Sequence, residues 1–343
     1  MKFLGKTIAV AVMSVMSAGV AYVEELAAQE LNVYSYRNQQ LLQPLLDAYT
    51  AETGTTFNIV HAPKGLAQRL QAEGASSPAD LVLTVDVSRI AELKELDLLA
   101  PLNSDIIAAR VPSWLRDADD SWTALTTRAR IVVTSKERVA EGAITRIEDL
   151  ADPQWQGRVC TRKGSHVYNR ALLASLIAHH GEAEAEKWVE GLVANLARKP
   201  QGNDRAQAKA IFAGECDVAI MNTYYYGKMK FNTKNPEQQE WGAAMRLVYL
   251  NQDDRGQHIN ISGGGIVKTS KRADAARAFL EWLTGVQAQQ IYASTNYEYP
   301  VNPAAKIDSE VASWGSFTAD TLPINALADN AEKAQMIIDR TGW

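Results

Sequence analysis

The sequence predicts an α/β protein in which two lobes face each other across a cleft. Three observations lead to this prediction. The chain has 343 residues, which is enough for two domains of ordinary size. Short apolar runs alternate with helical periodicities along most of its length, and this alternation occurs once before about residue 127 and again after it. Such alternation favours mostly parallel sheets that are covered by helices on both faces.

The composition is that of a soluble globular protein, with 46% hydrophobic and 22% charged residues. The net charge of −5 leaves no basic excess for phosphate groups, so we expect no nucleic-acid partner. The five histidines show no metal-binding spacing, and we expect His166 to be a solvent-facing loop residue. The sequence shows no Ser/His/Asp or paired-carboxylate catalytic motif, so we predict that the protein is not an enzyme.

A secretory signal peptide is predicted over residues 1–28. Lys2 and Lys6 precede an uncharged apolar run, Glu24 and Glu25 end it, and small residues follow. The alternative is an uncleaved membrane anchor. No other stretch reaches the roughly 18 apolar residues that a spanning helix needs. We therefore expect the mature chain to be exported and soluble.

Residues 29–127 are expected to form the first segment of the N-terminal lobe. Its clearest helix begins near Gln40, because four leucines and Tyr49 recur at helical spacing and Gly54 follows the last turn. The expected strands cover residues 31–36, 57–60 and 80–85, and the expected helices cover residues 40–53, 66–74 and 88–96.

Residues 128–250 are expected to form the C-terminal lobe. Its strands are predicted at 131–133, 158–160, 217–221 and 245–250, and its helices at 169–180, 182–196 and 204–213. The chain should then return to the N-terminal lobe over residues 251–304, with a strand at 265–268 and helices at 273–284 and 286–293. Residues 305–343 are expected to form C-terminal helices that pack on the C-terminal lobe. Two lobes that share crossover strands enclose a hinged cleft, where ligands tend to bind.

The chain contains two cysteines, Cys160 and Cys216. In an exported protein such a pair suggests one disulfide, which would stabilise the fold by about 4 kcal/mol in the chain-entropy model. Two buried thiols are the alternative. A metal site made by this pair is not expected, because no CxxC or histidine spacing accompanies it.

The most unusual stretch is Asn222-Thr223-Tyr224-Tyr225-Tyr226, which follows the predicted strand 217–221. If the chain stays extended, the three tyrosines point in alternating directions and cannot all enter the core. They lie where a strand ends and a loop begins, which is a common place for binding groups in α/β proteins. The alternative is an aromatic cluster with one edge in water.

A third tyrosine is placed to join them. Tyr168 lies eight residues after Cys160, and Tyr224 lies eight residues after Cys216. If the cysteines are bridged, both loops leave the same end of the sheet, and Tyr168, Tyr224 and Tyr225 converge. Three phenolates suit a hard trivalent cation, whose charge lowers the tyrosine pKa from about 10. Arg128, Arg130 or Arg205 would offset the phenolate charge or hold an anion, although a salt bridge is an equal alternative for Arg128.

The motif Asn222-Thr223-Tyr224-Tyr225, together with the upstream Tyr168-Asn169, is specific. Other matching segments mark a broader superfamily, and they are 31–35, 78–82, 127–130, 159–162, 205–208, 260–263 and 296–301. On these segments the chain resembles the bacterial periplasmic ferric-iron-binding proteins, which are the soluble receptors of Fe(III) ABC importers. The resemblance covers nearly the whole mature chain.

This resemblance implies a two-lobed periplasmic-binding-protein type II fold and a location in the periplasm. It implies that Tyr168, Tyr224 and Tyr225 bind Fe(III) from the C-terminal lobe and that Arg128 lies near the iron. Arg205 is a further candidate for contact with a synergistic anion such as carbonate. The implied partner is the membrane permease of an iron ABC importer, and a monomer is expected.

The N-terminal lobe departs from the family pattern. Family members often carry His, or His-Tyr, shortly after the first strand, whereas this chain has Asn38 and Gln39 there. Tyr36 lies nearby, and we infer that it acts as a fourth phenolate, with water or carbonate as the alternatives. The remaining tyrosines of these motifs are expected to pack rather than to bind metal, and they are Tyr226, Tyr297 and Tyr299.

The sequence is also compatible with two other functions. The first is a solute receptor for a polyamine-like organic cation or a small anion, in which the tyrosines stack on or hydrogen-bond to the solute. The second is a secreted iron-dependent oxidoreductase, which would show turnover and an open coordination position. A visible band from tyrosinate-to-iron charge transfer distinguishes the iron receptor from the solute receptor.

Overall fold

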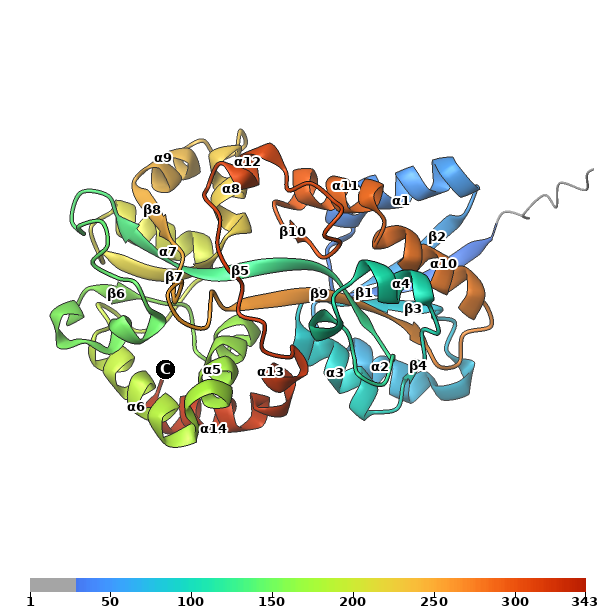
Figure 1. The fold of residues 1–343 in the computed structure, drawn as a ribbon, viewed down its shortest axis with the longest axis horizontal. Helices are drawn as coiled ribbons and strands as arrows, with labels where there is room; N and C mark the ends of the chain where they lie inside the picture. Colours follow the sequence, from blue (N-terminus) through green and yellow to red (C-terminus); the bar gives the residue numbers. More distant parts are fainter. Residues whose placement is uncertain (1–28) are drawn as a thin grey trace, which may run out of the picture.

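The computed structural model describes residues 29–343, and the predicted signal peptide lies outside this range. Two α/β lobes lie side by side and are joined by long strands that run from one lobe into the other (Figure 1). These strands are β5 (Thr123–Ser135) and β9 (Ile259–Val267), which pair antiparallel. The prediction of two α/β lobes is therefore confirmed. Within the described range, no helix has the length and apolar character that crossing a membrane requires.

In the N-terminal lobe, parallel strands continue from β9 outward in the order β3, β1, β2. The strands are β1 (Glu30–Ser35), β2 (Thr56–His61), β3 (Leu81–Leu83) and β4 (Leu99–Ala100). The helices are α1 (Gln39–Thr53), α2 (Leu66–Glu73), α3 (Val87–Glu95), α4 (Asp105–Arg110), α10 (Ala273–Leu283) and α11 (Val286–Asn296). Their apolar faces form one core, to which the predicted α1 leucines and Tyr49 contribute.

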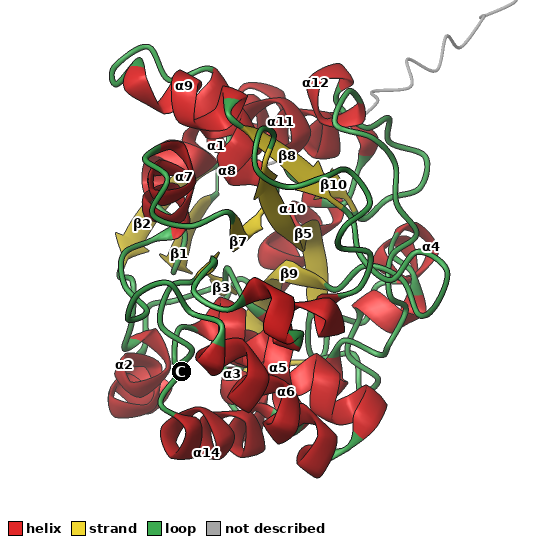
Figure 2. Ribbon diagram, turned by 90° about the vertical axis from the view of Figure 1, so that its left-hand side faces the viewer, coloured by secondary structure: helices red, strands yellow, loops and turns green. Residues whose placement is uncertain are grey.

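In the C-terminal lobe, the sheet continues from β5 through β7 to β6. The strands are β6 (Val159–Cys160), β7 (Val218–Asn222) and β8 (Met245–Val248). The helices are α5 (Val167–His180), α6 (Glu182–Ala194), α7 (Asp204–Phe212), α8 (Tyr224–Lys230) and α9 (Glu237–Ala243). Helices cover both sides of the strands (Figure 2), and a separate apolar core fills each side.

The prediction of a mostly parallel sheet is wrong for the middle of the molecule. Parallel pairing is confined to the outer strands, where β1 pairs with β2 and β3, and β6 pairs with β7. The pairs made by β5 and β9 are antiparallel, including the pair of β5 with β10 (Tyr299–Pro300). The reason is topological, because one crossover strand enters the second lobe and the other returns from it.

Residues 305–343 contact both lobes rather than the C-terminal lobe alone. This segment contains α12 (Ser309–Ala312), α13 (Asn325–Asp329) and α14 (Ala331–Thr341). Helix α14 packs on α5 and α6, and the Trp343 ring lies 5.7 Å from the Trp188 ring. Ile324 and Leu327, by contrast, are buried in the core of the N-terminal lobe. The C-terminal segment therefore crosses between the lobes before it reaches α14.

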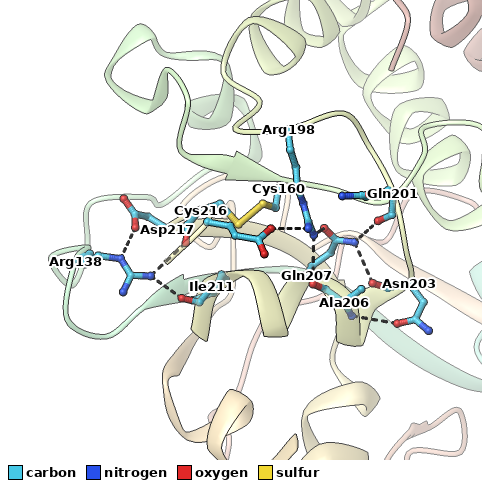
Figure 3. The surroundings of a disulfide bond; sticks show 11 residues. Arg138, Cys160, Arg198, Gln201, Asn203, Ala206, Gln207, Ile211, Cys216 and Asp217 are labelled. Carbon is cyan, nitrogen blue, oxygen red and sulfur yellow. Dashed lines mark hydrogen bonds and ion pairs between the residues drawn. A yellow bond between two sulfur atoms is a disulfide. The ribbon is translucent and has the colours of Figure 1, made fainter. Parts of the chain in front are cut away.

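The predicted disulfide is confirmed, since Cys160 of β6 is bonded to Cys216, which precedes β7. The alternative of two buried thiols is excluded. Ion pairs flank the bond. Arg138 pairs with Asp217 (Figure 3), and Arg198 pairs with Glu215. The bridge ties together the two parallel strands from which the tyrosine-bearing segments leave.

Candidate metal centre

The three predicted tyrosines are brought together at one edge of the C-terminal sheet. Strands β6 and β7 are parallel, so the chain leaves both at the same edge. After β6 a short loop leads to α5, which carries Tyr168 in its first turn. After β7, Thr223 leads directly into α8, whose first two residues are Tyr224 and Tyr225.

The phenol groups are in contact. The Tyr224 hydroxyl donates a hydrogen bond to the Tyr168 hydroxyl oxygen over 3.0 Å, and it accepts one from the Asn222 amide over 3.3 Å. The Tyr225 ring lies 4.5 Å from the Tyr224 ring. All three tyrosines line an open cleft of about 770 Å³ between the lobes. The cleft therefore presents three phenolic oxygen groups on one wall.

The expectation that the tyrosines alternate along an extended chain is wrong, because they form the first turn of helix α8. Successive side chains on a helix are rotated by about 100°. Tyr224 and Tyr225 consequently both reach the cleft, while Tyr226 turns away and its ring meets that of Trp314 edge-on at 5.5 Å. The helical turn is what lets two adjacent residues face the same site.

Tyr36 lies on the opposite, N-terminal wall of the cleft. Its hydroxyl accepts a hydrogen bond from the Ala67 backbone N–H over 3.1 Å, and the Arg89 guanidinium lies 4.4 Å from its ring centre. Among residues 29–343, no hydrogen bond links Tyr36 to the other three tyrosines. Asn38 caps the first turn of α1 by accepting from the Gln40 N–H. The structure thus separates Tyr36 from the cluster on the facing wall.

Burial keeps Tyr224 and Tyr225 in the neutral form when no metal is bound. It raises the pKa of Tyr225 to about 12, with the Asp204 carboxylate as the next cause. The pKa of Tyr224 is raised well above 10, first by burial and then by the neighbouring phenols. A ligand that draws these oxygens into the charged form must therefore be strongly cationic.

A buried ionic network beneath the tyrosines was missed by the sequence reasoning. Asp204, the first residue of α7, is fully buried and pairs with Arg162 at 2.9 Å and Arg130 at 3.2 Å. It also accepts from the backbone N–H of Asn222. Arg130 in turn donates to the side-chain oxygens of Asn169 and Asn222. Asn169 directly follows Tyr168 and Asn222 lies two residues before Tyr224, which was the one available signal in the sequence. The network therefore fixes both tyrosine-bearing segments.

The cleft also carries cationic groups around the tyrosines. The Arg128 guanidinium donates to the Val85 carbonyl and lies 4.0 Å from the Asp86 carboxylate, so the proposed salt bridge is present. Arg205 lies over the Tyr225 ring at 5.3 Å. Lys228, which the sequence reasoning missed, lies 5.0 Å from the Tyr224 ring centre, and burial lowers its pKa to about 8. This arrangement attracts negative charge into the cleft.

The prediction of a solvent-facing His166 is wrong. Its ring is half-buried against that of Tyr168 at 4.6 Å, and its Nδ1 accepts a hydrogen bond from the Tyr168 backbone N–H. Burial, followed by the charge of Arg162, lowers the pKa of His166 to about 3. His166 is therefore neutral and caps the first turn of α5. Across residues 29–343, no group of three or more His, Cys, Asp or Glu side chains is arranged to hold a metal ion.

Comparison with known proteins places these features in context. The sequence profile of bacterial extracellular solute-binding proteins matches residues 35–290. Iron uptake protein A1 of Synechocystis sp. is 39% identical over 316 residues, which cover 92% of this chain and 88% of that protein.

Two solved structures are similar over the same region. Ferric iron-binding protein A of Mannheimia haemolytica in an open conformation gives a TM-score of 0.87 at 43% identity, covering 92% of this chain and 99% of that one. The Trichodesmium protein IdiA (FutA), in complex with iron and citrate ligands, gives a TM-score of 0.88 at 38% identity, with the same coverage of both chains.

Proposed function

The chain belongs to the bacterial extracellular solute-binding protein family, and from this premise we propose that it is an Fe(III) receptor for iron uptake. In this proposal Tyr168, Tyr224 and Tyr225 bind the ion as phenolates, and the loaded receptor delivers it to the permease of an ABC importer. The observation that carries the proposal is the 3.0 Å contact between the Tyr224 and Tyr168 hydroxyls, with Tyr225 beside them. The relative named for iron uptake and the solved structure named for ferric-iron binding support the same cargo.

The donor set fits a hard trivalent ion. Phenolate oxygens are hard anions, and three of them balance the charge of Fe(III). In the free protein burial holds Tyr224 and Tyr225 in the neutral form, so they are not a site for weakly charged ions. Binding of Fe(III) supplies enough charge to displace the phenolic protons. The cleft therefore selects for high positive charge density.

A small anion completes the site more readily than Tyr36 does. To reach the ion, the Tyr36 hydroxyl would have to leave the Ala67 N–H that it now accepts from. Three phenolates already neutralise Fe(III), while Arg205 and Lys228 carry positive charge next to the tyrosines. An anion such as carbonate would satisfy both the metal and these cations. Tyr36 then contributes to the N-terminal wall of the closed cleft.

The receptor is proposed to work as an exported periplasmic monomer. The C-terminal lobe carries the tyrosines and captures the ion, and the N-terminal lobe closes over it by rotation about β5 and β9. Reopening of the cleft, reduction to Fe(II) or protonation of the phenolates would release the iron. Reduction and protonation weaken the attraction between the ion and the phenolate oxygens, while reopening removes the cover that the N-terminal lobe provides.

Loading of the purified protein with ferric citrate tests the proposal. We expect an orange-red protein with a visible tyrosinate-to-iron charge-transfer band that saturates at one iron per chain. Absorption spectroscopy with metal analysis measures both quantities. A colourless protein that binds a polyamine instead would favour the organic-cation receptor, and catalytic turnover would favour the oxidoreductase.

Acidification should bleach this band. If the metal were absent, the Tyr224 and Tyr225 phenolates would take up protons, because burial raises the pKa of both groups, and that of Tyr225 to about 12. Below that pKa, the apparent affinity falls about tenfold per pH unit for every proton exchanged. The affinity for Fe(III) therefore decreases as the pH falls. A pH titration of the loaded protein, monitored at the visible band, checks this, and a band that stays constant to the point of unfolding would argue against phenolate ligands.

A further inference from the structure

We propose that Gly227 and Tyr297 form a notch between the lobes that positions helix α8, and with it Tyr224 and Tyr225. Gly227 belongs to α8 of the C-terminal lobe, and Tyr297 ends α11 of the N-terminal lobe. The inference rests on the proposed function, because it assigns a role in placing two of the iron-binding tyrosines. Neither residue contributes a ligand oxygen in this proposal.

The contact between the two residues is unusually close. A Cβ atom built on Gly227 would lie 2.6 Å from Cγ of Tyr297 and 2.9 Å from a ring carbon of Trp314. Real Cβ atoms are not found at such distances, so only glycine lets the Tyr297 ring lie directly on the α8 backbone. Glycine is also a poor residue for the interior of a helix. Its place in α8 is therefore explained by the contact with the N-terminal lobe.

Tyr297 is held in a strained conformation at this position. Its φ angle of 58° lies in the left-handed region, which a bulky residue rarely adopts. Such strain persists only where the surroundings hold it, and it is concentrated at functional positions. Here the backbone turn at the end of α11 directs the ring onto α8.

Further contacts hold the same junction together. The Phe231 ring, at the end of α8, stacks on the Tyr297 ring at 5.8 Å with an interplanar angle of 14°. Lys230 of α8 pairs with Glu310 at 2.7 Å, and Glu310 also accepts from the indole N–H of Trp314. Both the aromatic and the ionic contacts join α8 to segments that follow β9. Helix α8 is thus held by both aromatic contacts and an ion pair.

The position of the notch couples it to the metal site. Tyr224 and Tyr225 lie within one turn of Gly227 on the same short helix, so a shift of the helix at Gly227 moves both side chains. An added methyl group would require the ring and the helix to separate by about 0.8 Å to reach the 3.4 Å at which ordinary contact begins. Metal ligands tolerate such displacement poorly, because binding sites need placement within about 0.5 Å.

The variant Gly227→Ala tests the proposal, with Gly242→Ala as the matched control. Gly242 also lies in a helix of the C-terminal lobe, but a Cβ there would meet nothing closer than 3.9 Å. We expect Gly227→Ala to bind Fe(III) about tenfold more weakly than the wild type, because overpacking displaces the helix. The charge-transfer band should shift at the same time, while Gly242→Ala should leave both quantities unchanged. Ferric chelate competition and absorption spectroscopy provide the two readouts.

Removal of the opposing ring separates positioning from a general loss of stability. The double variant Gly227→Ala/Tyr297→Ala lacks the Tyr297 ring that the added methyl group would meet. Its affinity for Fe(III) should be about threefold or more higher than that of Gly227→Ala, once the effect of Tyr297→Ala alone has been measured and taken into account. Wild-type affinity in Gly227→Ala, or no recovery in the double variant, would overturn the proposal. Failure of the wild-type protein itself to bind Fe(III) would instead refute the proposed function.

Discussion

Replacement of both Tyr224 and Tyr225 by phenylalanine should abolish the visible band and weaken Fe(III) binding by on the order of a thousandfold or more. The estimate follows because the loss of supporting groups around a metal site already costs about 10- to 100-fold, and this variant removes two direct ligands. Phenylalanine keeps the rings that pack in the first turn of α8, so the helix should persist. Absorption spectroscopy and competition with a ferric chelator measure the two effects.

Tyr226→Phe is the matched control, because the same substitution is made one residue further along the same helix. The Tyr226 ring packs against Trp314 and does not line the cleft. We expect this variant to keep its colour and its affinity. If the double variant Tyr224→Phe/Tyr225→Phe kept the wild-type band and affinity, with one iron per chain, these two residues could not be the ligands, and the phenolate site would have to lie elsewhere.

Replacement of Asp204 by asparagine should lower the free energy of unfolding by about 3–5 kcal/mol. The carboxylate is fully buried and is the shared partner of two buried cations, Arg130 and Arg162. Without its charge, both guanidinium groups stay buried with no anion to balance them, and this desolvation cost is what destabilises the fold. Chemical denaturation of the iron-free protein measures the change.

Asp274→Asn provides the control for this second prediction. Asp274 also lies in the first turn of a helix and pairs with an arginine, Arg277 at 2.6 Å, but its side chain is 95% exposed. An exposed pair of this kind contributes less than about 1 kcal/mol. An equally small effect at Asp204 would show that the buried network does not hold the tyrosine-bearing segments in place.

Asp204→Asn should also change the titration of the neighbouring phenol. Burial is the main cause of the raised pKa of Tyr225, and the Asp204 charge is the second. Removal of that charge should lower the pKa of Tyr225 below about 12 in the iron-free protein. A pH titration monitored by ultraviolet tyrosinate absorption measures this shift. The titration is repeated with Tyr225→Phe added, and the difference between the two curves gives the contribution of Tyr225.

Several features of the protein were predictable from the sequence because they depend on local chemistry. Helix α1 begins one residue before the predicted position and ends where it was predicted, since its periodic leucines and the glycine after it act locally. The disulfide followed from two cysteines in a chain predicted to be exported. The positions of Tyr168 and Tyr224, each eight residues after a bridged cysteine, then indicated a shared edge of the sheet.

Other features depend on partners that are distant in the sequence. Strand β5 extends over 13 residues, although only residues 131–133 look like a strand, because its polar first half pairs with β9 more than 100 residues away. Three consecutive tyrosines also did not predict the helical turn of α8 that directs Tyr224 and Tyr225 into the same cleft. The contact between the hydroxyl of Tyr36, the predicted fourth ligand, and the Ala67 N–H of its own lobe was likewise not predictable from local sequence.

The sequence by itself determined the two-lobed α/β class, the disulfide and the phenolic character of the candidate site, since each follows from residue type and local spacing. The tertiary structure decided how these groups are supported: Asp204 between two arginines, and Tyr297 against Gly227. The physical reason is that a buried charge or a close backbone contact has no local pattern. It exists only once folding has brought distant residues together and excluded water between them.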